Sequence, residues 1–208
     1  MIRIVTIERE YGCGGPDIAK NLAARLGWKL WDELLTSEIA RLTKSAPKAV
    51  ERREWRKDPV VYRIFKSFLR GAFEGSLPPT SQLQLLDAER IAKLSEHLVK
   101  VAADGVPCVI VGRDSQYFLR DRTDAFHVFL YAPREAKIRR MVSDRTPESV
   151  AIEQIEAIDR ERAAFIRKHF GRDWPDHHLY DLMLNTAVGD KAVVGMILSS
   201  VDQAGAAR

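Results

Sequence analysis

The sequence has few cysteines and no long hydrophobic stretch. Cys13 and Cys108 are the only cysteines in 208 residues, and they lack the spacing of a metal site. No apolar run approaches the ~18–20 residues that cross a membrane as a helix. The chain enters a strand pattern directly after Met1, without the features of a secretory signal. We therefore expect a reduced, cytoplasmic protein that does not enter a membrane.

Neither sign of charge is in large excess. The chain carries 33 Lys and Arg against 29 Asp and Glu, which gives a net charge of +4 and a pI near 9.1. That balance suits phosphorylated ligands, and the number alone would also suit nucleic acid. Because no aromatic and basic interleaving or base-reading motif accompanies it, we expect no nucleic-acid partner. The apolar content of 46% is that of an ordinary globular domain.

The first thirty residues hold the most distinctive pattern. The β-branched run over residues 2–7 is typical of a strand covered on both faces. It leads to Gly12, Gly14 and Gly15, which permit positive φ and let backbone N–H groups approach a ligand. Pro16 suits the first turn of a helix, and apolar residues follow it at helical spacing. This turn predicts an anion site made of backbone dipoles; a plain connecting turn is the alternative.

This stretch resembles the P-loop of the cytidylate kinase-like family, a branch of the P-loop nucleoside monophosphate kinases. The family carries Arg-Glu-Tyr-Gly-x-Gly-Gly, and residues 9–15 here read Arg-Glu-Tyr-Gly-Cys-Gly-Gly. The resemblance implies that ATP binds with Mg²⁺. Its phosphates would lie on Gly12, Cys13, Gly14, Gly15 and Asp17.

The loop departs from an ordinary Walker A pattern at two positions. Alignment of the glycines puts Gly15 where the phosphate-binding lysine belongs, and Asp17 where a Mg²⁺-binding Ser or Thr belongs. The loop therefore keeps its backbone cradle and loses its side-chain cation. Arg9 is the first candidate to replace that cation, and Asp17 is the nearest carboxylate for Mg²⁺.

The rest of the chain alternates between strand and helix patterns. Strands are predicted at 28–31, 106–111, 126–132 and 180–184, and helices at 16–26, 33–43, 83–103, 147–168 and 191–201, with another helix starting at 133. This order predicts an α/β fold, a three-layer sandwich around a mostly parallel sheet, as in P-loop nucleoside monophosphate kinases. We expect a single domain over residues 1–208.

Two segments are predicted to border the ligand. Residues 44–82 form a helical insert with a strongly amphipathic helix, which could cap the substrate cleft, pack in a dimer interface or lie on a membrane. Packing as a cleft-forming insert, in the monophosphate-binding region, is the default interpretation. Residues 143–175 resemble the mobile lid of the family. The sequence leaves open whether the chain forms a homo-oligomer.

Three residues are candidates for the acceptor site. Asp32 ends the second strand, where the resembled family opens its monophosphate region; it also suits the N-cap of the next helix. Arg113 and Asp114 follow the strand at 106–111 in a Gly-Arg-Asp turn that cytidylate kinases share. A guanidinium can grip phosphate oxygens bidentately, and a carboxylate can accept from ribose or base donors. A capped helix start near Asp114 is the alternative.

Further arginines are candidate catalytic groups. The helix after residue 133 carries Arg139 and Arg140, which point about 100° apart, so we expect at most one to reach the site. The family resemblance implies that arginines on this helix face the transferred phosphate, and we take Arg139 as the candidate. Arg160 and Arg162 match an Asp-Arg-x-Arg pattern in the family lid, where such groups stabilise the transferred charge. A surface helix with ion pairs between Glu156 and Arg160 is the alternative.

Two functions are consistent with these residues. The first is a phosphotransferase that moves the γ-phosphate of ATP to a nucleoside monophosphate such as CMP, or to a related small acceptor, through Arg9, Arg139, Arg160 and Arg162. The second is a catalytically weak or inactive nucleotide-binding protein, which Gly15 and Asp17 favour because they weaken the loop.

Overall fold

The computed structural model describes residues 1–32 and 88–207. The elements are β1 (Ile4–Arg9), α1 (Gly15–Leu26), β2 (Lys29–Trp31), α4 (Ala88–Asp104), β3 (Cys108–Val111), α5 (Ser115–Phe118), β4 (Ala125–Tyr131), α6 (Arg134–Ser143), α7 (Glu148–Phe170), β5 (Leu182–Asn185) and α8 (Asp190–Ala207). Two short 3₁₀ turns cover His177–Leu179 and Thr186–Val188. The helix expected at 33–43 and the insert at 44–82 lie outside the described residues.

The five strands form a parallel sheet in the order β2-β3-β1-β4-β5. β1 is central, and all six of its residues are buried. In the register, Ile7 of β1 pairs with Val111 of β3 on one side and with Val128 of β4 on the other. The carboxyl ends of β1 and β3 therefore lie side by side.

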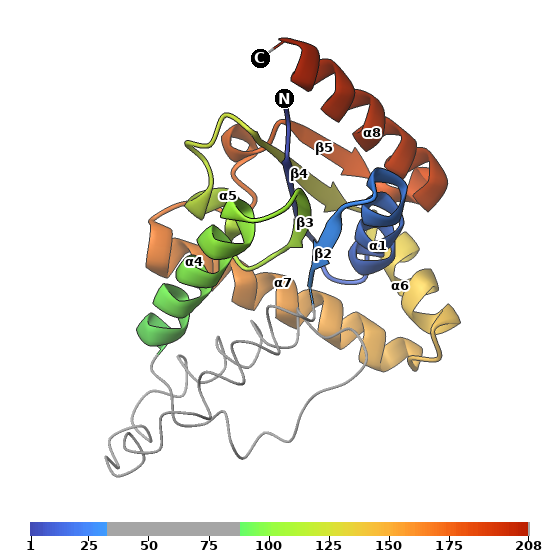
Figure 1. The fold of residues 1–208 in the computed structure, drawn as a ribbon. Helices are drawn as coiled ribbons and strands as arrows, with labels where there is room; N and C mark the ends of the chain where they lie inside the picture. Colours follow the sequence, from blue (N-terminus) through green and yellow to red (C-terminus); the bar gives the residue numbers. More distant parts are fainter. Residues whose placement is uncertain (33–87, 208) are drawn as a thin grey trace.

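Helices cover both faces of the sheet, as Figure 1 shows. Val5 and Ile7 pack with α1 and α8, through side chains such as Leu22 and Ile197. Ile4 packs on the opposite face with α4. This alternation along β1 follows from the two-residue period of a strand. The three-layer α/β sandwich predicted from the sequence is confirmed.

α7 crosses beneath the carboxyl ends of the strands (Figure 1). Its Ile155 and Ile158 pack with Tyr11 and Met141, directly beside the loop that follows β1. α7 fills most of the segment 143–175, whose role as a lid stays a prediction.

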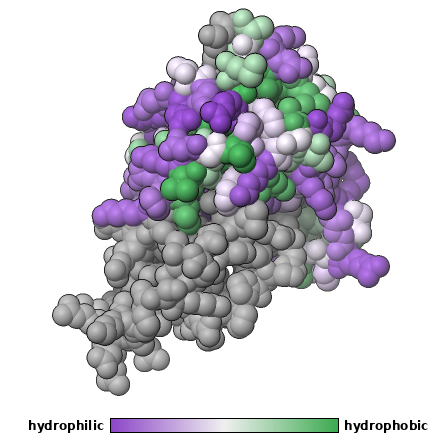
Figure 2. All heavy atoms as spheres, viewed as in Figure 1, coloured by the Kyte–Doolittle hydropathy of each residue, from purple (hydrophilic) through white to green (hydrophobic). Residues whose placement is uncertain are grey.

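Strand boundaries differ slightly from those predicted. β3 begins at Cys108 rather than at residue 106, because Val106 is exposed at 59% and precedes Pro107. β5 covers Leu182–Asn185 rather than residues 180–184. Hydrophilic side chains dominate the described part of the face that Figure 2 shows, with small hydrophobic groups among them. No helix in residues 1–32 and 88–207 has the length and apolar character needed to span a membrane.

Candidate active site

The turn after β1 leads into the amino end of α1. Gly12 and Gly14 adopt φ values of 77° and 81°, a left-handed region that glycine enters without a steric penalty. Gly14 is the N-cap of α1, and Pro16 follows in the first turn. The first N–H groups of such a helix have no partner within the helix and carry partial positive charge. The turn therefore has the backbone geometry that the predicted anion site requires, and binding of an anion there stays a prediction.

A second turn follows β3, next to the first. Gly112, Arg113 and Asp114 all adopt left-handed backbone conformations, with φ values of 64°, 60° and 54°. Two consecutive non-glycine residues in this region store strain of order 1 kcal/mol each. The Gly112 N–H donates to the carbonyl of Ile7 at 2.8 Å, which fixes this turn against β1. Strain of this kind concentrates at functional sites.

The side chain of Arg9 runs between the two turns. A Cβ on Gly15 would lie 2.8 Å from Arg9 Cγ, and a Cβ on Gly112 would lie 2.5 Å from Arg9 Nη1. A side chain at either position would force Arg9 to shift, and the left-handed φ of 64° at Gly112 disfavours other residues there as well. Arg9 is buried. Its aliphatic stem thus packs against the predicted phosphate loop at Gly15, and its guanidinium packs against the predicted acceptor turn at Gly112.

Acidic and basic groups gather around the second turn. Burial lowers the pKa of Arg113 to about 10, while the charge of Asp32 acts in the opposite direction. Burial, followed by the charge of Glu8, raises the pKa of Asp114 to about 8, against the influence of Arg162 and Arg113. Buried charges of both signs compensate one another here, which is typical of a site built for a charged ligand.

α7 is bonded to the backbone of the first turn. Asp159 Oδ1 accepts a hydrogen bond from the Tyr11 N–H at 2.8 Å. Arg162 Nη1 donates to the carbonyl oxygen of Arg9, and it lies 4.0 Å from Glu8 Oε1. Arg162 therefore lies beside the first turn, and its catalytic role stays a prediction.

Lys137 of α6 is buried behind the turn. Its Nζ donates to Glu10 Oε2 at 3.0 Å and to Asp159 Oδ2 at 3.2 Å. Burial alone would lower the pKa of Lys137, but the two carboxylates outweigh it and the net shift is upward. A Cβ on Gly12 would lie 3.4 Å from the Lys137 Cβ. Lys137 thus supports the turn from the side of α7.

Arg140, one turn further along α6, lies against the same loop. A Cβ on Gly14 would lie 2.8 Å from Arg140 Nε and would overlap the rest of the guanidinium. Arg139 is exposed, so the structure brings Arg140 to the turn and does not bring Arg139 there. The reason is the helix period: Lys137 and Met141 are the buried residues of α6, and Arg140 lies on their side.

The remaining predicted residues lie at different distances from the turn. Cys13 is buried within it, and its thiol faces the Leu130 carbonyl oxygen at 3.7 Å. Asp17 is exposed in the first turn of α1. Asp32 is partly buried and acts on Arg113, as described above. Arg160 is exposed on α7, and the structure does not bring it to the turn.

The amino-acid sequence matches the cytidylate kinase-like family over residues 4–188. The chain belongs to that family. Membership makes it a nucleoside monophosphate kinase-like phosphotransferase and implies the use of a nucleotide. The match includes the glycine turn after β1 and the Gly-Arg-Asp turn after β3, whose roles in binding stay predictions. No curated protein is similar enough to count as a match.

Solved structures share the fold of this cytidylate kinase-like chain. An uncharacterized protein from Eubacterium ventriosum is 23% identical, with a TM-score of 0.66 over 98% of this chain and 99% of that one. A shikimate kinase from Acinetobacter baumannii, in complex with shikimate, is 14% identical, with a TM-score of 0.53 over 98% and 94%. A gluconokinase from Sinorhizobium meliloti is 13% identical, with a TM-score of 0.52 over 96% and 91%. At these identities the likeness shows the fold alone.

A divalent cation would fit this family member only with help from phosphate. Among residues 1–32 and 88–207, no cluster of three or more His, Cys, Asp and Glu could hold a metal ion. Mg²⁺, however, commonly uses one or two carboxylates and completes its shell with phosphate oxygens and water. Asp17, exposed beside the phosphate loop, meets that requirement as a single carboxylate.

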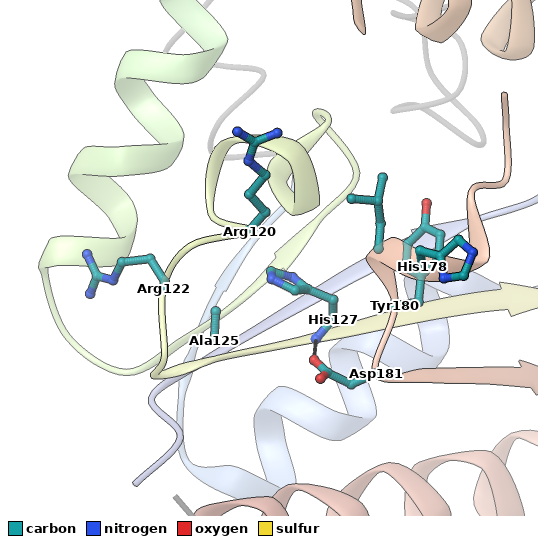
Figure 3. A pocket seen from close by; sticks show the side chains of 8 residues that line it. Arg120, Arg122, Ala125, His127, His178, Tyr180 and Asp181 are labelled. Atoms are coloured by element: carbon teal, nitrogen blue, oxygen red, sulfur yellow. Dashed lines mark hydrogen bonds between the residues drawn. The ribbon is translucent and has the colours of Figure 1, made fainter. Parts of the chain in front are cut away.

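A pocket of about 170 Å³ lies apart from the phosphate loop, at the amino-terminal half of β4 and before β5. Figure 3 shows the His127 ring at its centre and the guanidinium groups of Arg120 and Arg122 turned away from it. The His127 N–H donates to Asp181 at 2.8 Å, and Nδ1 lies 2.7 Å from Thr6 Oγ1. His127 thus holds strands together, and the pocket is separate from the kinase site.

Proposed function

We propose that the protein transfers the γ-phosphoryl group of ATP to a nucleoside monophosphate, with CMP or a closely related small acceptor as substrate. The observation that carries this proposal is the position of Arg9, which packs against Gly15 of the phosphate loop and against Gly112 of the acceptor turn. With the donor on the first turn and the acceptor on the second, the Arg9 guanidinium beside Gly112 would lie close to the transferred group. It would neutralise charge that develops during transfer.

The donor would bind at Gly12–Gly15, through backbone N–H groups at the amino end of α1. Asp17 would contribute one carboxylate to Mg²⁺, whose chemistry is to bridge and neutralise phosphate oxygens. Because Gly15 replaces the usual lysine, cations from other elements must supply its charge. Arg9 and Arg162 are buried or nearly so beside the turn, and we assign that role to them.

The acceptor would bind at the β3 turn. Arg113 offers a planar fork of donors that matches a monophosphate, and Asp32 lies close enough to influence its pKa. The left-handed backbone at residues 112–114 fixes the conformation of the turn that carries Arg113. Phosphoryl transfer of this kind depends mainly on positioning and charge, and needs little covalent chemistry from the protein. We propose a cytoplasmic location as well, because neither cysteine is in a disulfide.

The test is a diphosphate-forming assay with purified protein, ATP, Mg²⁺ and one acceptor at a time from CMP, dCMP, UMP and AMP. We expect CDP from CMP, and a loss of about 10²-fold or more in rate for Arg113→Ala. Arg134→Ala is the matched control, since Arg134 is an exposed arginine on α6 that pairs only with Glu156 among the described residues. No diphosphate from any acceptor would contradict the proposal.

A nucleotide-binding protein without turnover is the second candidate. The observation that favours it is the ion pair between Arg140 and Asp190. Because Asp190 already binds the Arg140 guanidinium, this cation is less available to phosphate, next to a loop that already lacks the usual lysine. In that case ATP would raise the melting temperature of the protein, while no monophosphate would be converted.

A further inference from the structure

The outer side of the phosphate loop carries an ion pair between two helices. Arg140 of α6 meets Asp190, the first residue of α8, through two hydrogen bonds. Nη2 lies 2.5 Å from Oδ1, and Nη1 lies 3.1 Å from Oδ2. The side chains are 27% and 28% exposed, so water reaches the pair. This is the parallel, bidentate geometry in which a guanidinium binds a carboxylate or a phosphate.

The same guanidinium packs against Gly14. A Cβ there would lie 2.8 Å from Arg140 Nε and closer still to Cζ and Nη1, so the group is in contact with the N-cap of α1. The pKa of Arg140 is raised mainly by its hydrogen bond to Asp190, and the charges of Cys13 and Asp17 in and beside the loop also contribute. An oligophosphate on the turn would therefore approach a guanidinium whose donors Asp190 already holds.

We propose that Asp190 sets the nucleotide affinity of this site, by competing with phosphate for the guanidinium of Arg140. The inference rests on the proposed function only in that a nucleotide binds the glycine turn. Arg140 adds a further cation on the outer side of the loop, in addition to Arg9 and Arg162, and Asp190 is its partner while the loop is empty. Both anions use the same two parallel N–H donors. Binding of the phosphate chain thus requires Arg140 to release Asp190.

A purely structural role for the pair leads to different expectations. If Asp190 only fastened α8 to α6, its loss would loosen the loop and weaken nucleotide binding. Under competition, its loss removes a negative charge near an anion site and frees a cation, so binding becomes tighter. The direction of the change therefore separates the two explanations.

The experiment measures ATP binding by titration calorimetry, in EDTA so that no transfer occurs. The variants are Asp190→Asn, Arg140→Ala and the double variant. Asp202→Asn on α8 and Arg134→Ala on α6 are controls with the same charge changes at exposed positions. We expect Asp190→Asn to bind ATP about three- to fivefold more tightly and Arg140→Ala about tenfold more weakly. In the protein that already carries Arg140→Ala, Asp190→Asn should not increase the affinity for ATP. Inorganic tripolyphosphate should give the same ratios.

Equal or weaker ATP binding by Asp190→Asn would overturn the inference, as would a gain that persists without Arg140 or a wild-type protein that does not bind ATP. Melting temperatures of the free variants show whether each is folded, and Asp190→Ser removes the same charge if the Asn variant unfolds. The kinase assay separates the two proposals. Turnover without an effect at Asp190 refutes only the inference, whereas the expected binding pattern without turnover refutes only the kinase.

Discussion

Lys137 of α6 and Asp159 of α7 meet at 3.2 Å behind the phosphate loop. The Lys137 side chain is 8% exposed and also contacts Glu10. Removal of one partner from a buried ion pair leaves the other charge uncompensated, at a cost of about 3–5 kcal/mol. Asp159 keeps Arg162 at 3.6 Å and the Tyr11 N–H as partners. We therefore predict that Lys137→Met lowers the free energy of unfolding by about 3 kcal/mol, the lower end of that range, measured by urea denaturation.

The exposed pair between Arg134 and Glu156 joins the same two helices and provides the comparison. Arg134→Met should change the unfolding free energy by less than about 1 kcal/mol, because water screens such pairs. Equal losses in the two variants would show that burial of Lys137 has no energetic consequence.

Gly14→Ala tests the contact between the loop and Arg140. The left-handed φ of 81° alone should lower stability by about 1–2 kcal/mol, and overlap of the new Cβ with the guanidinium adds to that loss. Adding Arg140→Ala to the Gly14→Ala protein should remove the loss of stability caused by the overlap, while the loss caused by the left-handed φ should remain. Urea denaturation of the four proteins in a double-mutant cycle measures the coupling between the two residues; strict additivity would contradict the packing described above.

Asp114 makes stability depend on pH. Its carboxyl has a pKa of about 8 in the folded protein and about 4 in the unfolded chain. Between these values the folded state keeps a proton that the unfolded state has lost, so stability falls as the pH rises from about 4 to about 8. The groups that influence Asp114 are Glu8 on β1, Arg162 on α7 and the neighbouring Arg113.

Asp114→Asn imitates the protonated carboxyl at every pH. We therefore predict that its melting temperature declines less than that of the wild-type protein between pH 5 and pH 8. If the melting temperatures of the two proteins changed equally between pH 5 and pH 8, Asp114 would be ionised in the folded state and the prediction would be wrong.

The sheet and the two turns could be predicted because their signals are local. β-branched runs mark the buried strands, and closely spaced glycines mark a turn that needs positive φ. The Gly-Arg-Asp sequence after a buried strand indicated that Arg113 and Asp114 lie at the edge of the sheet where the parallel strands end. Asp114 is also the N-cap of α5, the alternative that the sequence left open, and the role of both residues in binding stays a prediction.

The residues from α6 and α8 could not be predicted in the same way. Arg139 and Arg140 are neighbours on a charged helix, and only the packing of Met141 and Lys137 decides which arginine turns toward the loop. Spacing offers one partial signal, because Lys137, Arg140 and Met141 share a face at intervals of three and four. Asp190 had no local signal at all, since its partner comes from another helix.

The central claim is that the guanidinium of Arg9 serves phosphoryl transfer between the two turns. The most direct measurement is the initial rate of CDP formation from ATP and CMP by wild-type protein, Arg9→Met and Arg134→Ala, each first shown to be folded by its melting transition. We predict that Arg9→Met is slower by about 10²–10³-fold and that Arg134→Ala is unchanged. A folded Arg9→Met protein that forms CDP at the wild-type rate would contradict the account.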